Sequence, residues 1–126
     1  MAARFFGFCL VAAIAVLAAA PVPSPAWAID TNISGAELLA RCQGTPALLK
    51  SDQLYCKGYL EGIEDMIAET RAQGKPAEFC VPTGGVSDDQ LRQAYITWGQ
   101  ANASEMRQSS REAALAAFRA TYPCKP

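Results

Sequence analysis

Residues 51–74 read SDQLYCKGYLEGIEDMIAETRAQG, and this stretch decides the fold. A step of about 100° per residue separates its side chains into an apolar side and a charged side, which is the pattern of an amphipathic helix. The apolar side, expected to face the core, comprises Cys56, Tyr59, Leu60, Ile63, Met66, Ile67 and Thr70. The charged side comprises Lys57, Glu61, Glu64 and Asp65. Ser51 or Asp52 can cap the start of this helix, and Gly74, just ahead of Pro76, can end it. The sequence predicts that this helix is the longest element.

Two glycines, Gly58 and Gly62, lie one helical turn apart on the flank between these two sides. Each glycine costs a helix about 1 kcal/mol relative to alanine, so the pair indicates that another group approaches the backbone closely. The favoured interpretation is structural, with another helix or the segment around Cys80 crossing over the glycines. The functional alternative is a groove for a protein partner, edged by Asp65 and Glu69.

Three serine-led capping boxes surround the long helix and predict three further helices. They pair Ser34 with Glu37, Ser87 with Gln90, and Ser109 with Glu112. The expected helices run from about Gly35 to Cys42, from Ser87 to about Gly99, and over residues 110–121. Residues 43–50 are expected to form a loop, and residues 102–110 a mobile connection. No alternating run or hairpin turn favours strands, so the prediction is an all-α, small four-helix domain.

The first 28 residues have the pattern of a cleaved secretory signal peptide. Arg4 precedes an apolar run over residues 5–20, and Ala26-Trp27-Ala28 forms an A-x-A cleavage site. The run is too short to span a bilayer, which takes about 18 or more apolar residues. We therefore expect residues 1–28 to be removed, residues 29–126 to form a single domain in the periplasm, and no membrane association after cleavage.

Residues 29–126 contain four cysteines, an even number that is typical of a disulfide framework in an oxidising compartment. Four cysteines allow three pairings, and the order of the helices favours one. Cys42 ends the first expected helix and Cys56 lies in the first turn of the second, so a helix–loop–helix turn brings them together. Cys80 then pairs with Cys124. Loops of about 15 and 45 residues closed in this way contribute roughly 3 and 4 kcal/mol in the loop-entropy model.

The residue types argue against several classes of function. The chain has no histidine, 11 basic and 12 acidic residues, and a formal charge of −1, so no basic surface for nucleic acid is expected. Adjacent acids such as Asp88 and Asp89 do not face one another on a helix, and no histidine can activate a serine. No C-x-x-C motif supports a zinc or thiol redox site. We expect no enzyme activity, no cofactor and no metal. The aromatic residues Tyr95, Trp98, Phe118 and Tyr122 are expected in the core.

The ordered set of motifs resembles the Rap/Tai immunity proteins of type VI secretion. The resemblance rests on Ser34-Gly35 with Glu37-Leu38-Leu39 and Cys42, Tyr55-Cys56-Lys57-Gly58-Tyr59 with Gly62 and Asp65, Phe79-Cys80-Val81-Pro82, Val86-Ser87 with Gln90-Leu91, and Tyr122-Pro123-Cys124. It implies a periplasmic, all-helical, non-enzymatic protein that binds and blocks a toxin, in the best-known members a peptidoglycan-cleaving amidase. Such proteins are often dimers, so a homodimer is also expected.

A periplasmic acid-stress chaperone, a holdase for unfolded clients, is the alternative from another class of protein. Small disulfide-linked helical proteins of this kind expose apolar surface on acidification. Because the chain has no histidine, such a switch would depend on carboxylates and act below about pH 5. Client binding that appears only in acid would distinguish this function from immunity.

Overall fold

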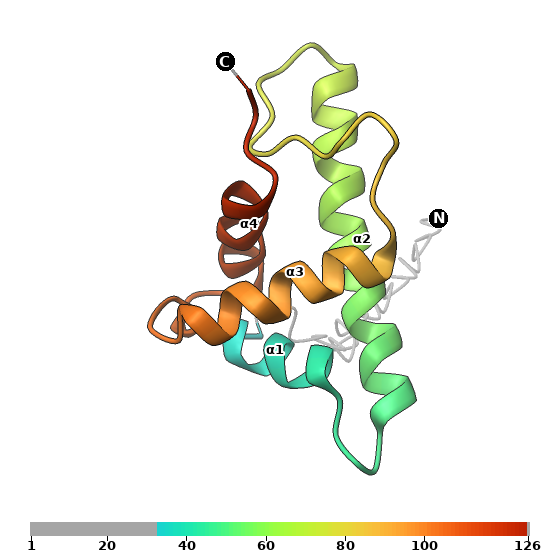
Figure 1. Cartoon of the computed structure of the whole chain (residues 1–126), viewed down its shortest axis with the longest axis vertical. Helices are drawn as coiled ribbons and strands as arrows, with labels where there is room; N and C mark the ends of the chain where they lie inside the picture. Colours follow the sequence, from blue (N-terminus) through green and yellow to red (C-terminus); the bar gives the residue numbers. More distant parts are fainter. Residues whose placement is uncertain (1–32, 126) are drawn as a thin grey trace, which may run out of the picture.

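The computed structural model describes residues 33–125, which form a helical domain (Figure 1). Its elements are α1 (Gly35–Gln43), α2 (Leu49–Ala72), α3 (Asp88–Ala101), the short 3-10 helix η1 (Glu105–Arg107) and α4 (Ser110–Thr121). Within the described range the extended backbone pairs only at an isolated bridge between Ser34 and Ser109. The prediction of an all-α, four-helix domain is confirmed. None of the helices in this range is long and apolar enough to cross a membrane. The predicted signal peptide lies outside the described residues.

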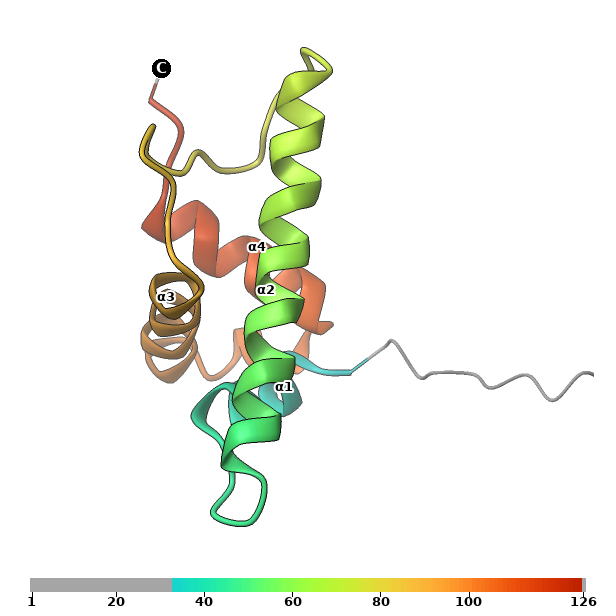
Figure 2. The ribbon, with the colours of Figure 1, turned by 90° about the vertical axis from the view of Figure 1, so that its right-hand side faces the viewer.

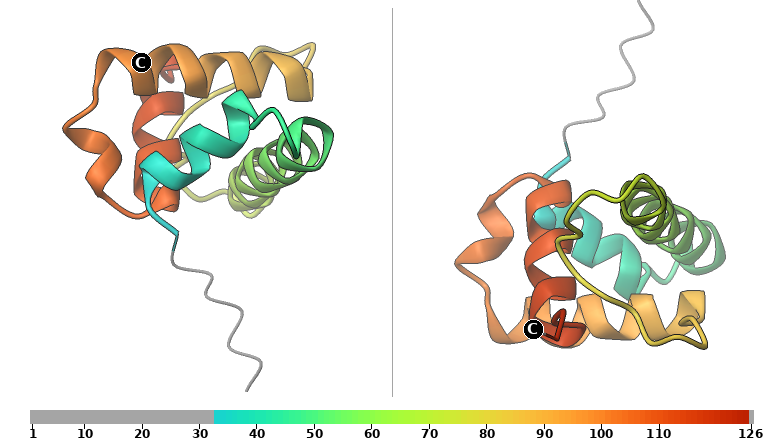
Figure 3. Two further views of the ribbon diagram at one scale, coloured as in Figure 1. Left: turned by 90° about the horizontal axis from the view of Figure 1, so that it is seen from below. Right: turned by 90° about the horizontal axis from the view of Figure 1, so that it is seen from above.

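The longest helix, α2, runs along one edge of the domain. The other helices all pack against the same face of α2, the face that points into the domain. Figure 2 shows α2 at the front along the long axis, with α3 and α4 beside and behind it. Seen end-on in Figure 3, α2 lies at the edge of the group of helices. At 24 residues, α2 is much longer than α1, which has 9, and α4, which has 12. These helices therefore cover only part of the surface of α2.

The core lies where α1, α2, α3 and α4 converge. Its largest fully buried side chains are Tyr95, Phe79, Phe118, Leu38, Leu60 and Leu115. The Tyr95 hydroxyl donates a hydrogen bond to the Gly35 carbonyl at 2.9 Å, and the Phe79 and Phe118 rings lie 5.1 Å apart. The predicted core positions of Tyr95 and Phe118 are confirmed, and Trp98 and Tyr122 pack on the core while remaining partly exposed.

The capping predictions hold at α1 and α3, where both reciprocal hydrogen bonds of the capping box are present. At α4 the Ser109 hydroxyl accepts from the Glu112 amide at 3.3 Å. The predicted start of α2 is wrong, because the helix begins at Leu49 and Asp52 is buried inside it. The Asp52 carboxylate instead accepts from the Thr45 amide and hydroxyl at 3.2 and 3.0 Å, so it fixes the loop before α2. A tertiary contact has taken the place of the expected cap.

The segment over residues 102–110 is also more ordered in structure than expected. It contains η1, and Met106 is only 3% exposed. Met106 lies against the start of α1, where a Cβ added to Gly35 would come within 3.1 Å of the Met106 carbonyl oxygen. The prediction of a mobile connection is therefore wrong for the part of this segment that Met106 anchors.

Both predicted disulfides are present. Cys42 bonds to Cys56 and links α1 to the first half of α2, and both residues are fully buried. Cys80 bonds to Cys124 and links the segment after α2 to the end of the chain. The Cys80 amide also donates to the Tyr122 carbonyl at 2.8 Å, so this second link includes a backbone hydrogen bond.

Candidate partner-binding face

The two glycines of α2 lie on its open side. A Cβ added to Gly58 or Gly62 would meet nothing within 4 Å among the described residues. The favoured prediction, that another helix or the Cys80 segment crosses over these glycines, is wrong. The reason is the one-sided packing of α2: α1, α3 and α4 contact the opposite side, and Phe79 carries the returning chain into that same core.

Exposed apolar side chains gather on the same helix and on the turn that leads into it. Among the described residues, the exposed large hydrophobic side chains are Leu48 (59%), Leu49 (49%), Leu54 (61%), Tyr55 (42%) and Met66 (40%). Scattered exposed apolar residues are normal, but all five of these lie on α2 or on the turn before it, and such a concentration is typical of an interaction site. The predicted core position of Met66 is therefore wrong. Met66 lies next to Gly62 on the helix surface, at the edge of the buried row rather than within it.

Leu54, Gly58, Gly62 and Met66 follow one another at intervals of four residues and thus form a continuous row along α2. We define the α2 face by this row and its neighbours on the same side, Leu54, Tyr55, Gly58, Gly62, Asp65, Met66 and Glu69. All seven residues are exposed. The structure brings the four predicted contact residues, Gly58, Gly62, Asp65 and Glu69, together on this face.

Tyr55 is held in place on the face by its neighbours. The Arg41 guanidinium lies over the Tyr55 ring, 4.7 Å from its centroid, and is 3.6 Å from the buried Asp52 carboxylate. The Tyr59 ring stacks on the Tyr55 ring at 6.3 Å, and the Tyr59 hydroxyl is hydrogen bonded to Ser110 in α4 at 2.7 Å. A side chain that is already ordered loses little entropy on binding, which suits Tyr55 as an anchor for a partner.

One flank of the α2 face is acidic. Four carboxylates, Glu61, Glu64, Asp65 and Glu69, fall between Lys57 and Arg71 with no basic residue among them. Burial, followed by the charges of Asp65 and Glu61, raises the pKa of the Glu64 carboxyl. Lys57 does not neutralise this group, because its amino group lies 2.7 Å from Asp89 in α3. The face thus combines an apolar row with a negative edge.

The other polar residues considered in the sequence analysis have structural roles. Ser34, Ser87 and Ser109 cap helices, and Asp89 lies in the first turn of α3 and pairs with Lys57. In the part of the chain that the structure describes, no group of three or more candidate ligands is placed to hold a metal ion.

The sequence pattern predicted Gly58, Gly62, Asp65 and Glu69 as partner contacts, which stays a prediction, and it did not point to the apolar residues of the same face. Leu54 and Tyr55 are exposed on the α2 face, and Leu54 and Met66 frame the glycines at regular four-residue spacing. That spacing was the available signal.

Comparison with known proteins identifies a family. The family model described as Rap1a immunity proteins matches residues 34–124, which include the four helices and both disulfides. No curated protein and no solved structure matches the chain. The resemblance found from the ordered motifs is thereby confirmed over the whole described domain, and the chain belongs to the Rap1a immunity protein family.

Proposed function

We propose that this protein is exported to the periplasm after removal of residues 1–28, and there binds and blocks a protein toxin delivered by type VI secretion. A peptidoglycan amidase is the class of toxin that the family resemblance implies. The membership of residues 34–124 in an immunity protein family supports a toxin as the partner. The gathering of exposed apolar residues beside two open glycines supports the α2 face as the contact surface. Blocking a toxin by binding requires complementary shape and hydrogen bonding, and no chemistry of the inhibitor's own.

The α2 face can bind a protein closely for three reasons. Gly58 and Gly62 let a partner's backbone approach the helix, because no side chain over residues 33–125 comes within 4 Å of a Cβ placed on either glycine. Leu54 and Met66 flank this gap and offer apolar area to bury, while Tyr55 supplies an ordered aromatic anchor. The acidic flank favours a basic surface on the toxin and would speed their encounter at low salt.

A homodimer, also expected from the resemblance, would have to form through another surface. Two copies of α2 packed face to face would bring the acidic residues Glu61, Asp65 and Glu69 of one copy against those of the other. Like charges placed against each other across an interface cost several kcal/mol. We therefore propose a dimer that leaves the α2 face free for the toxin.

Co-expression tests this function. Periplasm-targeted products of neighbouring genes are expressed one at a time with the exported, tagged protein, and growth and capture are measured together. One toxic product that the tagged protein captures, with growth restored, is the expected result. If no neighbour is toxic and none is captured, the immunity proposal fails, and acid-dependent binding of an unfolded client would then favour the chaperone alternative.

Two leucine variants locate the contact surface. Gly62→Leu adds a side chain in the middle of the open row, where the helix has room for it, and should abolish capture and protection. Gln100→Leu adds the same side chain to an exposed position of α3 and should leave both intact. Equal behaviour of the two variants would show that the toxin binds elsewhere.

A further inference from the structure

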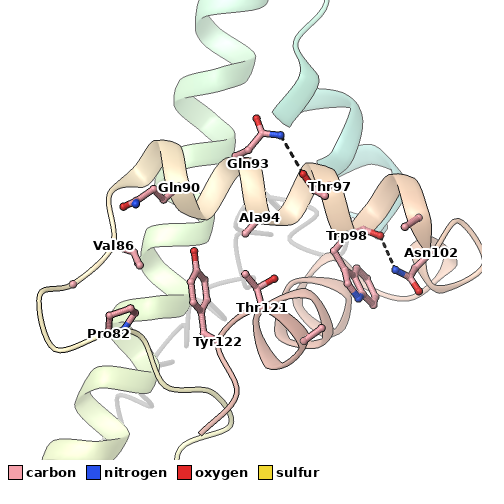
Figure 4. Close-up of a pocket in the computed structure, with 13 residues that line it drawn as sticks. Pro82, Val86, Gln90, Gln93, Ala94, Thr97, Trp98, Asn102, Thr121 and Tyr122 are labelled. Carbon is pink, nitrogen blue, oxygen red and sulfur yellow. Dashed lines mark hydrogen bonds between the residues drawn. The ribbon is translucent and has the colours of Figure 1, made fainter.

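A separate groove lies on the other side of the domain, between α3, the loop over residues 82–86 and the end of α4. Its volume is about 660 Å³, within the range of about 300–1,000 Å³ that is usual for small-molecule sites. Figure 4 shows its 13 lining residues, none of which carries a charge. The groove shares no residue with the α2 face.

Two aromatic side chains stand on either side of the floor of the groove. Figure 4 shows Tyr122 on one side and Trp98 on the other, with Ala94 and Thr121 between them. Both rings pack on the core at their bases and remain partly exposed. The small floor residue Ala94 leaves space for a flat ring to lie between or against them.

The polar groups around this floor are neutral amides and hydroxyls. The Gln93 Nε2 donates to Thr97 Oγ1 at 3.1 Å, and the Asn102 Nδ2 donates to the Trp98 carbonyl at 2.8 Å. Gln90 uses its Oε1 to accept from the Ser87 amide at 2.8 Å. Each of these side-chain amides is thus oriented by a hydrogen bond through one of its two polar atoms. The other polar atom has no hydrogen-bond partner among the described residues and can bind a ligand.

The Tyr122 wall is fixed before any ligand binds. Its backbone amide donates to Phe118 at 2.7 Å, and its carbonyl accepts from Cys80, which the disulfide ties to Cys124. Burial raises the pKa of the Tyr122 phenol, so the hydroxyl stays protonated and can donate a hydrogen bond. A preformed site of this kind avoids the entropy cost of ordering its wall on binding.

We propose that this groove binds an uncharged sugar chain with acetamido groups. The C–H faces of a sugar ring pack against aromatic rings, and its hydroxyls and acetamido group match side-chain amides that both donate and accept. Val86, Ala94 and Ala101 offer apolar neighbours to acetamido methyl groups at different points along the groove. An anionic ligand is disfavoured because no lining residue is basic. This site does not rest on the proposed toxin function.

The test uses the fluorescence of Trp98 and a soluble oligomer of N-acetylglucosamine as the probe. The protein is used as residues 29–126, in which Trp98 is the single tryptophan. Saturable change in Trp98 emission, with a Kd in the millimolar range or tighter, is expected. A glucose oligomer of equal length lacks the acetamido groups and should bind several-fold more weakly.

Variants that retain Trp98 test whether the change in its emission comes from binding in the groove. Ala94→Leu fills the floor and should abolish the titration, and Gln93→Ala should weaken it about tenfold, the loss expected for one hydrogen bond of about 1.4 kcal/mol. Arg111→Ala, at an exposed position of α4 whose side chain pairs with its neighbour Glu112, should have no effect. Circular dichroism confirms that each variant is folded.

Three outcomes would overturn the proposal. The first is no change in Trp98 emission up to about 10 mM oligomer, a concentration range that covers weak specific binding. The second is an unchanged titration in Ala94→Leu, and the third is equal binding of both sugars. A change in Trp98 emission only when the toxin is added would assign the groove to the protein interface instead. Toxin capture in the co-expression test is independent of each of these results.

Discussion

Replacing both open glycines of α2 with alanine should stabilise the protein. A Cβ at Gly58 or Gly62 meets nothing within 4 Å among the described residues, so the substitutions add no clash. Alanine is more favourable than glycine inside a helix by about 0.8–1.0 kcal/mol, which gives about 2 kcal/mol for the pair. At roughly 4–8 °C per kcal/mol for a domain of this size, the Tm should rise by roughly 8–16 °C.

Thermal unfolding followed by circular dichroism measures this effect, and urea unfolding gives the free energy directly. Gly35→Ala is the matched control, because its Cβ would lie 2.7 Å from the Ala113 Cβ and 3.1 Å from the Met106 carbonyl oxygen. That substitution overpacks the junction of α1 and α4 and should cost about 1–3 kcal/mol. An unchanged or lower Tm in Gly58→Ala/Gly62→Ala would mean that these positions are covered in the native protein, which would refute an open α2 face.

Three further predictions concern interactions that stabilise the domain: a buried hydrogen bond, a disulfide and two ionised carboxylates. Tyr59→Phe removes the hydrogen bond to the buried serine at the start of α4 and should lower the free energy of unfolding by about 1–3 kcal/mol, measured in urea. Cys80→Ser with Cys124→Ser should cost about 4 kcal/mol by the loop-entropy model and loosen the end of the chain, seen as faster hydrogen exchange there; unchanged stability would contradict it. The hydrogen bonds from Ser34 lower the pKa of Glu37, and Lys57 lowers that of Asp89, so their stabilisation is complete above their ordinary pKa and is lost as the pH falls through the lowered values. Stability should decrease in that acidic range, and Glu37→Gln should make the decrease shallower.

Local patterns predicted the elements of this fold well, because the groups that set them are near in sequence. The capping boxes at Ser34 and Ser87 need only a residue three positions away, and the Cys42–Cys56 link follows from one helix–loop–helix turn. Asp52 could not be placed in this way. Aspartate is a common N-cap residue, but here the Asp52 carboxylate is buried and interacts with Thr45 and Arg41 instead of capping the helix.

The candidate site was predicted only in part, because periodicity shows which residues share a side and not how far neighbouring helices extend. Met66 lies near the apolar side by angle, yet α2 is too long and too close to the edge of the domain for its partners to cover that position. The cost of Gly58 and Gly62 predicted a close approach by another part of this chain, and the open space beside them contradicts it among the described residues. A partner molecule at these glycines stays a prediction. Such a distinction needs tertiary structure.

The affinity of the purified protein for its captured toxin tests the central claim most directly. Calorimetric titration compares the unchanged protein with Gly62→Leu and Gln100→Leu, each first shown to be folded. We predict saturable binding that Gly62→Leu weakens at least about 100-fold, equivalent to roughly 2.7 kcal/mol, and that Gln100→Leu leaves unchanged. Equal affinity of all three proteins would contradict toxin binding through the α2 face.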